Sequence, residues 1–390
     1  MRSATNCWDW ASDMNKPIRI GMVGGSLGSA GFMGRVHRMV QRLDGEYTLR
    51  AGCFSSRPDR NRETGDALAL DPTRVYADYA RMARAEAARD DGIQVVSIVT
   101  PNHLHVPVAR AFVEAGIHVI CEKPMATSLA DARSLRDLAA RHGVAVMLTH
   151  NYSGYPAVRR ARDLVASGAL GELRIVQVDY AQDWLSEPGD EGWRGDPAQA
   201  GPAGALGDIG THAYQLATYV AGCTATELSA DLHTFVPGRR LDDYAQAMLR
   251  FAGGARGRLS VSQVSPGNNN RLQLALYGTK AGLQFDQESP DSLLFSPLGE
   301  PARRLDRGGP GPAGAADQRA SRIPAGHPEG YLEAFAQLYR DFAAMLRGDD
   351  AAVALLPDAT TGCEGMAFVE AMLASHRAEG RWTPLPAVAV

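Results

Sequence analysis

Lys123 is the strongest candidate for a catalytic or ligand-binding side chain, because of its position in the sequence. It stands in Glu122-Lys123-Pro124, directly after the apolar run 117–121, which reads as a buried strand. In an open parallel sheet, ligands bind outside the carboxyl ends of the strands, so a lysine delivered there faces a cofactor or substrate. The alternative is an ordinary surface ion pair at a strand end. An ammonium group in a cleft could hydrogen-bond a reacting oxygen and share its proton.

A second candidate group is Asp208 with His212, in the segment Gly-Asp-Ile-Gly-Thr-His. A helix is predicted from this segment to about residue 220. Residues four apart on a helix project from the same face, so this pair could hold a hydroxyl between them. A carboxylate near an imidazole favours its protonated form, which predicts proton exchange near neutral pH. The alternative is a capping aspartate followed by a histidine on the helix face.

A glycine-rich loop follows the β-rich run 18–23 and precedes a helix predicted over 35–43. Glycines permit a tight turn and close backbone approach, and the amino end of the helix presents free N–H groups to a pyrophosphate. The loop ends in Ser29-x-Gly31-x-x-Gly34, with serine where a first glycine is expected. A plain connector is the alternative. The predicted contacts here are Gly24, Gly25, Ser26, Gly31, Phe32, Met33 and Gly34.

The next predicted strand, 47–54, ends in Ser55-Ser56-Arg57. An acidic residue at that point would bind the 2′-hydroxyl of NAD, whereas hydroxyls and an arginine suit a 2′-phosphate. These three residues therefore predict NADP as the favoured cofactor, with NAD possible. The alternative is that Arg57 is a solvated loop charge.

Strands and helices alternate through the first 150 residues, which predicts a doubly wound parallel sheet. Further strands are predicted over 92–99, 117–121 and 144–148, and further helices over 107–115 and 129–141.

The second half has a different pattern and predicts one large, mostly antiparallel sheet. Strand-like segments recur at 173–180, 244–251, 257–263 and 272–277, and helices are predicted over 157–167, 331–347 and 361–377. Polar and aromatic residues that could line a polyol pocket are Tyr152, Gln182 and Trp184, with Tyr155, Asp183 and His327 as weaker candidates.

With the glycine loop, Thr100-Pro101-Asn102, Glu122-Lys123-Pro124 and the Asp208/His212 pair in this order, the chain resembles the Gfo/Idh/MocA family of sugar and inositol oxidoreductases. The resemblance implies an α/β protein with an amino-terminal Rossmann domain and a carboxyl-terminal α/β domain on a large open sheet. It places Thr100, Asn102, His105, Glu122, Trp193 and Arg194 at the cofactor, with Arg194 also at the substrate. The corresponding domain prediction is an extension over 1–16, a dinucleotide-binding domain over 17–150, and a substrate-binding and oligomerisation domain over 151–390.

The activity implied is reversible NAD(P)-dependent oxidation of a secondary alcohol on a cyclic polyol, sugar or glycoside. His212 would be the acid/base, Lys123 would hydrogen-bond the reacting oxygen, and Asp208 would orient His212 or a neighbouring hydroxyl. Two alternatives keep the cofactor: a redox-neutral glycoside hydrolase, and a non-catalytic cofactor-sensing protein. Self-association through the open sheet, as a homodimer or homotetramer, is also expected.

Composition and charge argue against several other classes of protein. The net charge of −4 lacks the basic footprint that a nucleic-acid backbone requires. Nothing approaches the ~20 consecutive apolar residues needed to span a bilayer, and residues 1–16 lack a signal-peptide pattern. The five cysteines are widely spaced without metal-ligand spacing, which predicts a reducing, cytoplasmic setting and no metal site.

Overall fold

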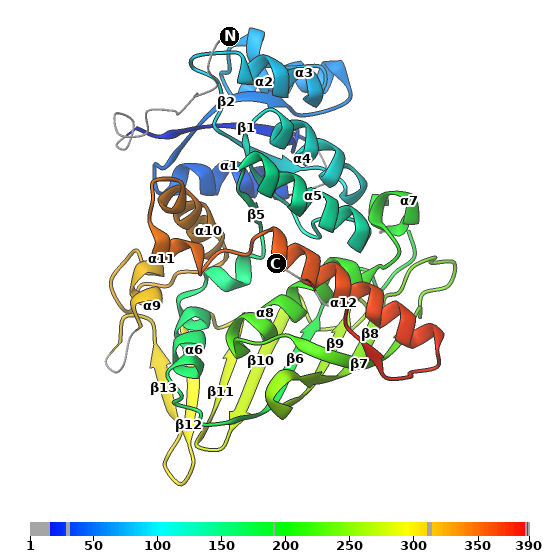
Figure 1. Cartoon of the computed structure of the whole chain (residues 1–390), viewed down its shortest axis with the longest axis vertical. Coiled ribbons are helices and arrows are strands. Elements are labelled where there is room, and N and C mark those ends of the chain that lie inside the picture. The colour runs from blue at the N-terminus through cyan, green and yellow to red at the C-terminus, as the bar shows by residue number, and fades with distance from the viewer. Residues whose placement is uncertain (1–15, 29–31, 190–191, 310–313, 387, 389–390) are drawn as a thin grey trace.

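The computed structural model describes residues 16–28, 32–189, 192–309, 314–386 and 388. A five-stranded parallel sheet, in the order β2-β1-β3-β4-β5, forms the first half and lies at the top of Figure 1. The strands are β1 Ile18–Gly24, β2 Tyr47–Cys53, β3 Val95–Val99, β4 His118–Cys121 and β5 Val146–Leu148. The strand order reverses between β1 and β3, which is where such sheets bind ligands.

Helices follow each strand and complete the doubly wound arrangement that the sequence predicted. They are α1 Met33–Leu43, α2 Pro58–Ala67, α3 Tyr79–Ala87, α4 His105–Glu114 and α5 Leu129–His142. The termini of α5 show why the chain folds this way locally. Ser128 caps its first turn by accepting a hydrogen bond from the Asp131 amide, and Gly143 ends it in the left-handed conformation.

A nine-stranded sheet forms the second half, in the order β13-β12-β11-β10-β6-β9-β8-β7-β14. Within this second sheet, among the described residues, strands β6 and β9 pair in parallel and the other neighbouring strands pair antiparallel. The strands are β6 Leu173–Ala181, β7 Ala225–His233, β8 Tyr244–Phe251, β9 Arg256–Ser262, β10 Arg271–Gly278, β11 Ala281–Asp286, β12 Ser292–Pro297, β13 Arg303–Asp306 and β14 Thr383–Pro384. The predicted fold class, a Rossmann sheet followed by a large antiparallel sheet, is confirmed.

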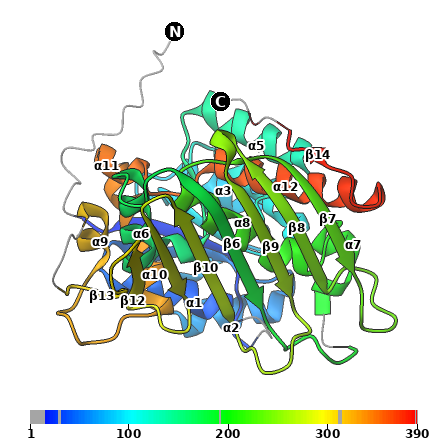
Figure 2. The same cartoon turned by 90° about the horizontal axis from the view of Figure 1, so that it is seen from below.

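One face of this sheet is covered by helices, as the view in Figure 2 shows with the strands in front and the helices behind. The helices of the second half are α6 Pro156–Ala166, α7 Pro197–Ala200, α8 Thr211–Ala221, α9 Ala315–Ala320, α10 Tyr331–Leu346, α11 Asp350–Val353 and α12 Ala359–Arg377. The uncovered face carries half-exposed apolar side chains beside charged ones, with Met248 56% exposed and Ile175 41% exposed.

Helix α10 lies far along the chain but packs on the first sheet, beside α1 (Figure 1). Phe335, Leu338 and Phe342 share one buried core with Ile20 and Val95 of the first sheet. The Tyr47 hydroxyl also donates to the Tyr339 carbonyl at 2.8 Å. The first half is therefore completed by a segment from near the end of the chain, and the division of the chain at residue 150 stays a prediction.

Two structural findings concern what the described part of the chain lacks. Within it, none of the helices has the length and apolar character that crossing a bilayer requires. The same residues contain no group of three or more His, Cys, Asp or Glu side chains arranged to hold a metal ion.

Candidate active site

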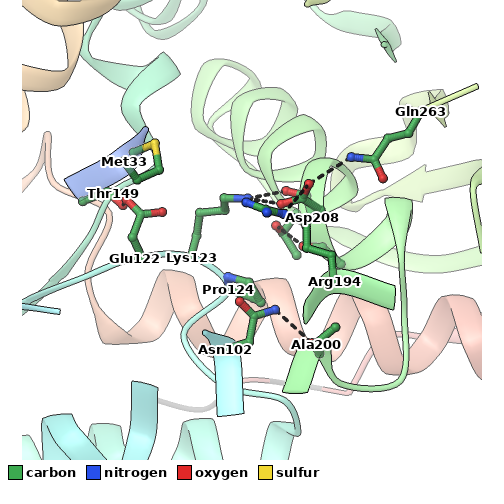
Figure 3. Close-up of polar contacts among 12 residues, drawn as sticks. Met33, Asn102, Glu122, Lys123, Pro124, Thr149, Arg194, Ala200, Asp208 and Gln263 are labelled. Atoms are coloured by element: carbon green, nitrogen blue, oxygen red, sulfur yellow. Dashed lines mark hydrogen bonds and ion pairs between the residues drawn. The ribbon is translucent and has the colours of Figure 1, made fainter. Parts of the chain in front are cut away.

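Lys123 and Asp208 meet between the two halves of the molecule, as Figure 3 shows. Lys123 follows β4, and its Nζ lies 2.8 Å from Asp208 Oδ1 and 2.6 Å from the Asp208 carbonyl oxygen. Both side chains are mostly buried, at 13% and 22% exposed. The residue at the strand end therefore faces the second half of the chain, where the sequence placed the other candidate catalytic groups.

Asp208 does not lie on a regular α-helix. It belongs to a π-helical turn, Leu206–Gly210, in which the Thr211 amide donates to the Leu206 carbonyl five residues earlier. Asp208 and His212 are therefore separated by a π-helical turn that leads into α8, whereas the sequence predicted one regular helix through both residues. Such π-helical turns are rare and frequently occur at functional sites.

The carboxylate of Asp242 holds the start of this turn. It accepts hydrogen bonds from the amides of Gly204 at 2.7 Å and Leu206 at 2.8 Å. These are amides at the amino end of the helix, which lack partners within the helix itself. Asp242 lies 34 residues beyond Asp208 (242 − 208) in the loop before β8, and sequence reasoning did not single it out.

Asp208 has two further partners besides Lys123. Its Oδ2 accepts from Gln263 Nε2 at 2.9 Å and lies 3.6 Å from Arg194 Nε. Burial by itself would raise the pKa of Asp208, but the nearby Lys123 and Arg194 cations outweigh it and hold that pKa well below its usual value. Asp208 is therefore an ionised carboxylate that fixes Lys123, and its predicted role of orienting His212 or a neighbouring hydroxyl stays a prediction.

His212 lies at the start of α8 in a buried pocket of rings. The ring of His150 packs edge-on against it at 5.2 Å between centroids, and the ring of Tyr152 does so at 4.9 Å. Burial lowers the pKa of His212 well below its usual value, with Lys123 and His150 acting in the same direction and Asp208 opposing. The Asp208 carboxylate does raise the pKa of His212, as predicted, but burial lowers it by more. The imidazole is therefore neutral at pH 7.

A hydrogen-bonded network of neutral side chains extends from Asp208 along the second sheet. Gln263 Nε2 donates to Gln182 Oε1 at 3.2 Å, and Gln182 Nε2 donates to Asn270 Oδ1 at 2.7 Å. Tyr180 also donates to Asn270, at 2.7 Å, and Asn270 donates to the Tyr152 hydroxyl at 3.2 Å.

Three residues of this network were predicted, namely Tyr152, Gln182 and Trp184, which donates to Gln182 at 2.9 Å. Gln263, Asn270 and Tyr180 were missed. Each lies at or next to a strand end of the second sheet, and only the alternation of buried positions along β6 and β9 could have indicated them. The structure thus places a wall of amides and phenols beside Asp208 and His212, which suits hydroxyl groups of a ligand.

The glycine loop packs β1 closely against α1. A Cβ added at Gly34 would lie 2.5 Å from Gly25 Cα, and one added at Gly24 would lie 2.2 Å from the Val99 carbonyl oxygen. Gly24 and Gly25 both have positive φ, at 82° and 70°. Such close backbone contacts at a strand-to-helix turn fit a pyrophosphate held by main-chain N–H groups. The glycines that make these contacts are thus Gly24, Gly25 and Gly34.

The other loop residues are placed as follows. Gly31 lies outside the described residues. Phe32 precedes α1 and is 62% exposed. Its ring lies 6.4 Å from that of Tyr331, whose hydroxyl is 3.7 Å from Met33 Sδ. Aromatic side chains from α1 and α10 therefore flank the amino end of α1. Ser26 is half-buried in the same loop.

Ser55, Ser56 and Arg57 follow β2 at the amino end of α2. The Arg57 guanidinium is exposed and forms an ion pair with Asp59, with Nη2 2.6 Å from Oδ2. The hydrogen bond that Arg57 donates to the Asp59 carboxylate raises the pKa of Arg57. The Ser55 hydroxyl accepts from the Arg57 amide at 3.2 Å. The predicted ribose-binding residues therefore lie together, and an acid is adjacent to the arginine.

Glu122 precedes Lys123 and is engaged inside the protein. Its Oε1 accepts from Thr149 at 2.6 Å and lies 2.9 Å from His37 Nε2 on α1. Burial opposes ionisation, but His37 and Lys123 lower its pKa below the usual value. The carboxylate therefore ties the strand end that carries Lys123 to the helix that begins at the glycine loop.

Asn102 and His105 were predicted at the cofactor. Asn102 opens a 3-10 turn, Asn102–Leu104, and its Nδ2 donates to the Ala200 carbonyl at 2.9 Å (Figure 3). The fully buried His105 places its ring nitrogens 2.7 Å from the Pro124 carbonyl and 2.9 Å from that of Thr100. His105 therefore supports the Lys123–Pro124 turn from inside, and its ring has no face toward a ligand because burial is complete.

Arg194 lies between two indole rings and the carboxylate of Asp208. Its guanidinium carbon is 4.7 Å from the Trp193 ring centroid and 5.7 Å from that of Trp184. The predicted pairing of Trp193 with Arg194 is thus present at the edge of the site. His327 is exposed, and its ring lies 3.3 Å from the Pro324 carbonyl within its own loop, away from this group.

Two family models match the chain. Residues 18–150 match the model described as "Oxidoreductase family, NAD-binding Rossmann fold", and residues 158–284 match the "GFO/IDH/MocA C-terminal domain". A levoglucosan dehydrogenase of Pseudarthrobacter phenanthrenivorans is 31% identical over 74% of this chain and 78% of its own length.

Two solved structures are similar over nearly the whole chain. An oxidoreductase from Sinorhizobium meliloti has 46% identity and a TM-score of 0.87, with 94% of this chain and 99% of that one covered. An inositol dehydrogenase homolog from Azotobacter vinelandii, complexed with NADH and myo-inositol, has 38% identity and a TM-score of 0.88, with 95% and 98% covered.

Fold, site and comparisons together define an NAD-binding oxidoreductase. The chain belongs to the Gfo/Idh/MocA family, as its resemblance indicated.

Proposed function

We propose that this protein transfers a hydride between NAD(P) and a secondary alcohol or ketone of a cyclic polyol, sugar or glycoside. The observation that carries the proposal is the contact of Lys123 with Asp208, 2.8 Å apart, beside the neutral imidazole of His212. It joins a cation from the first half to a carboxylate and a base from the second. Similarity to a levoglucosan dehydrogenase and to an inositol dehydrogenase homolog supports the substrate class.

The cofactor supplies hydride acceptance or donation at its nicotinamide. Gly24, Gly25 and Gly34 would hold its pyrophosphate, because their missing side chains leave the backbone accessible. The remaining task of the protein is to orient one carbinol group and move one proton. In the oxidation direction, neutral His212 accepts the hydroxyl proton while Lys123 donates a hydrogen bond to the same oxygen. Asp208 keeps the ammonium of Lys123 in place, and the amide and phenol wall binds the other hydroxyls.

A cofactor and substrate screen tests this proposal. NAD+ and NADP+ would be incubated separately with inositols, aldoses, anhydrosugars and glycosides, and absorbance of the reduced nicotinamide would be followed. We expect reduction with at least one neutral cyclic polyol or sugar, and a rate lower by about 10²–10⁴-fold with the His212→Ala variant. Release of free sugar from a glycoside without net reduction would indicate a redox-neutral hydrolase instead. Tight dinucleotide binding with no turnover across the panel would contradict an enzyme.

The proposed cofactor preference is NADP, with Arg57 as the group that binds the 2′-phosphate. Its support is the absence of an acid at the end of β2 and the position of Ser55, Ser56 and Arg57 at the amino end of α2. Asp59 competes for the same guanidinium. We therefore expect Arg57→Ala to lower the ratio of kcat/KM for NADP+ to that for NAD+, and Asp59→Asn to raise it. A wild-type preference for NAD+ that Arg57→Ala leaves unchanged would contradict the assignment.

We also propose self-association as a homodimer or homotetramer through the uncovered face of the second sheet. That face combines exposed Met248, Ile175 and Leu294 with the Arg258–Asp179 ion pair. Symmetric closure is the usual outcome for soluble oligomers. Sedimentation equilibrium of the wild type and of a Met248→Lys variant measures it. We expect a defined oligomer that the added charge weakens, and a monomeric wild type would contradict the proposal.

A further inference from the structure

His150 lies directly after β5 and belongs to the buried interior of the site, although sequence reasoning did not select it. Its side chain is buried, and its ring meets the His212 ring at a centroid distance of 5.2 Å and an interplanar angle of 89°. The Nδ1 atoms of both imidazoles are buried, and neither has a hydrogen-bond partner among the described residues. Two adjacent buried imidazoles without partners are unusual, because buried polar atoms are nearly always hydrogen-bonded.

The segment 149–152, which carries His150, contacts both Glu122, the neighbour of Lys123, and His212. Thr149 donates to Glu122 at 2.6 Å, next to Lys123. Tyr152, two residues after His150, packs edge-on against His212 at 4.9 Å and 72°. The His212 ring therefore has neighbouring rings from one short stretch of chain. That stretch is itself anchored, since the Leu148 amide donates to the Pro357 carbonyl and the Thr149 amide donates to the Cys121 carbonyl.

We propose that His150 is a positioning residue for His212: its ring keeps the catalytic imidazole dry and fixed in one orientation. The inference rests on the proposed function, because it assumes that His212 is the acid/base. Edge-to-face ring pairs attract one another in addition to the effect of the apolar area that they bury. This attraction favours one orientation of a side chain that would otherwise rotate about its χ2 bond.

The charged and titratable groups around His212 give this arrangement a measurable consequence. Lys123 faces it from the end of β4, His150 from the end of β5, Tyr152 from the following turn, and Asp208 from the π-helical turn. Burial is the largest of the influences and lowers the pKa of His212, so access of water to its ring would raise that pKa. Oxidation of an alcohol requires the neutral imidazole. A raised pKa of His212 therefore moves the acidic limb of the kcat/KM profile to higher pH.

A matched pair of variants tests the inference. His150→Phe keeps an aromatic ring in the same place, whereas His150→Ser leaves room for water. Oxidation rates would be measured from pH 5 to 9 together with the dissociation constant of the reduced cofactor. For His150→Ser we expect an acidic limb shifted toward the ordinary histidine pKa of about 6.5 and a kcat lowered about tenfold, because the His212 ring is then free to leave its productive orientation. For His150→Phe we expect a profile close to wild type.

Control variants separate this result from simple loss of stability. His118 is a second histidine whose pKa burial lowers, to about 4, but it lies at the opposite end of β4 from Lys123. His118→Ser should therefore lower the melting temperature without moving the acidic limb.

Three results would overturn the inference. One is a folded His150→Ser variant with the wild-type profile and kcat. Another is an equal shift of the limb in His150→Phe and His150→Ser, which would assign the effect to the ring nitrogens. The third is a rise in KM alone, which would make His150 a direct substrate contact. Near-normal activity of His212→Ala would instead refute the proposed function itself.

Discussion

The glycine loop and the polar group around Asp208 are two regions of the site that are built by different means. On the cofactor side, the contacts come from backbone: Gly25 and Gly34 pack so closely that an added Cβ at Gly34 would lie 2.5 Å from Gly25 Cα. Around Asp208 and His212, they come from side chains on distant segments: Lys123 and His150 follow β4 and β5 of the first half, Asp208 lies in the π-helical turn, and Gln263 follows β9. A backbone site depends on local turn geometry, whereas a side-chain site depends on how whole sheets are packed together.

The largest effect should come from the two groups that we place at the reacting oxygen. His212→Ala and Lys123→Met should each lower kcat about 10²–10⁴-fold, the usual contribution of general acid-base assistance. Steady-state kinetics would measure turnover, and fluorescence titration would measure cofactor affinity, which should be unchanged. Near-normal turnover in either variant would remove that residue from the mechanism.

A substitution on the cofactor side should give the opposite pattern. Gly34→Ala forces the glycine loop away from α1, and overpacking of this kind costs about 1–3 kcal/mol, or roughly 10- to 100-fold in cofactor affinity. The control is Gly365→Ala in α12, where an added Cβ meets no atom within 4 Å. This second change should preserve cofactor binding and raise stability by up to ~1 kcal/mol, the helix propensity of alanine over glycine. Equal cofactor affinity in the two variants would contradict the close-packing argument.

Gln263 links the Asp208 carboxylate to the polar wall, because its amide donates to both Asp208 and Gln182. A substitution there tests how far the side-chain region depends on packing between distant segments. Gln263→Leu removes a hydrogen bond to an ionised group, worth about 1.5–3 kcal/mol. We expect kcat/KM to fall roughly 10- to 100-fold with cofactor affinity intact. Gln246→Leu, at an exposed position of β8, is the control and should leave kinetics unchanged. A Gln263→Leu variant as active as that control would show that Asp208 holds its position without the amide.

The smallest effect concerns stability against acid. Burial lowers the pKa of His150 to about 3, so between its ordinary pKa and that value the unfolded chain binds a proton that the folded chain does not. The free energy of unfolding should therefore decrease as pH falls below about 6.5. From urea unfolding at pH 7 and pH 5, we expect His150→Phe to lose less stability on acidification than wild type, by about 1–2 kcal/mol. Equal losses would mean that His150 is solvated in the native protein.

The order of strands and helices in the first half could be predicted from sequence, because each element depends on a local pattern. The apolar runs before Gly24 and Glu122 are strands, and the segment after Ser128 is a helix with its cap. The strand segment 244–251 of the second half was also predicted with its observed bounds. Charged and polar residues that directly follow the strands, such as Lys123, indicated the position of the site because the carboxyl ends of parallel strands lie at one edge of the sheet.

Three features of the site could not be predicted in this way. The π-helical turn around Asp208 depends on Asp242, whose carboxylate binds the amides of Gly204 and Leu206 from another loop. The neutral state of His212 depends on burial among rings from residues 150 and 152, which outweighs the adjacent carboxylate. Helix α10 packs on a sheet formed by the first part of the chain, nearly 200 residues earlier than its own start (331 − 148).

The sequence by itself determined the cofactor class, the doubly wound first half and the identity of the lysine, aspartate and histidine in the site. The glycines at a turn and the lysine at a strand end follow from residue types at local positions, whereas the Asp208/His212 pair was selected through the resemblance to the Gfo/Idh/MocA family. Tertiary structure alone decided which of these groups pair. Asp208 binds Lys123 because a turn and a strand end from different halves meet, and His212 is neutral because distant segments exclude water from it. Pairing and solvation are set by packing over long sequence separations, which no local pattern encodes.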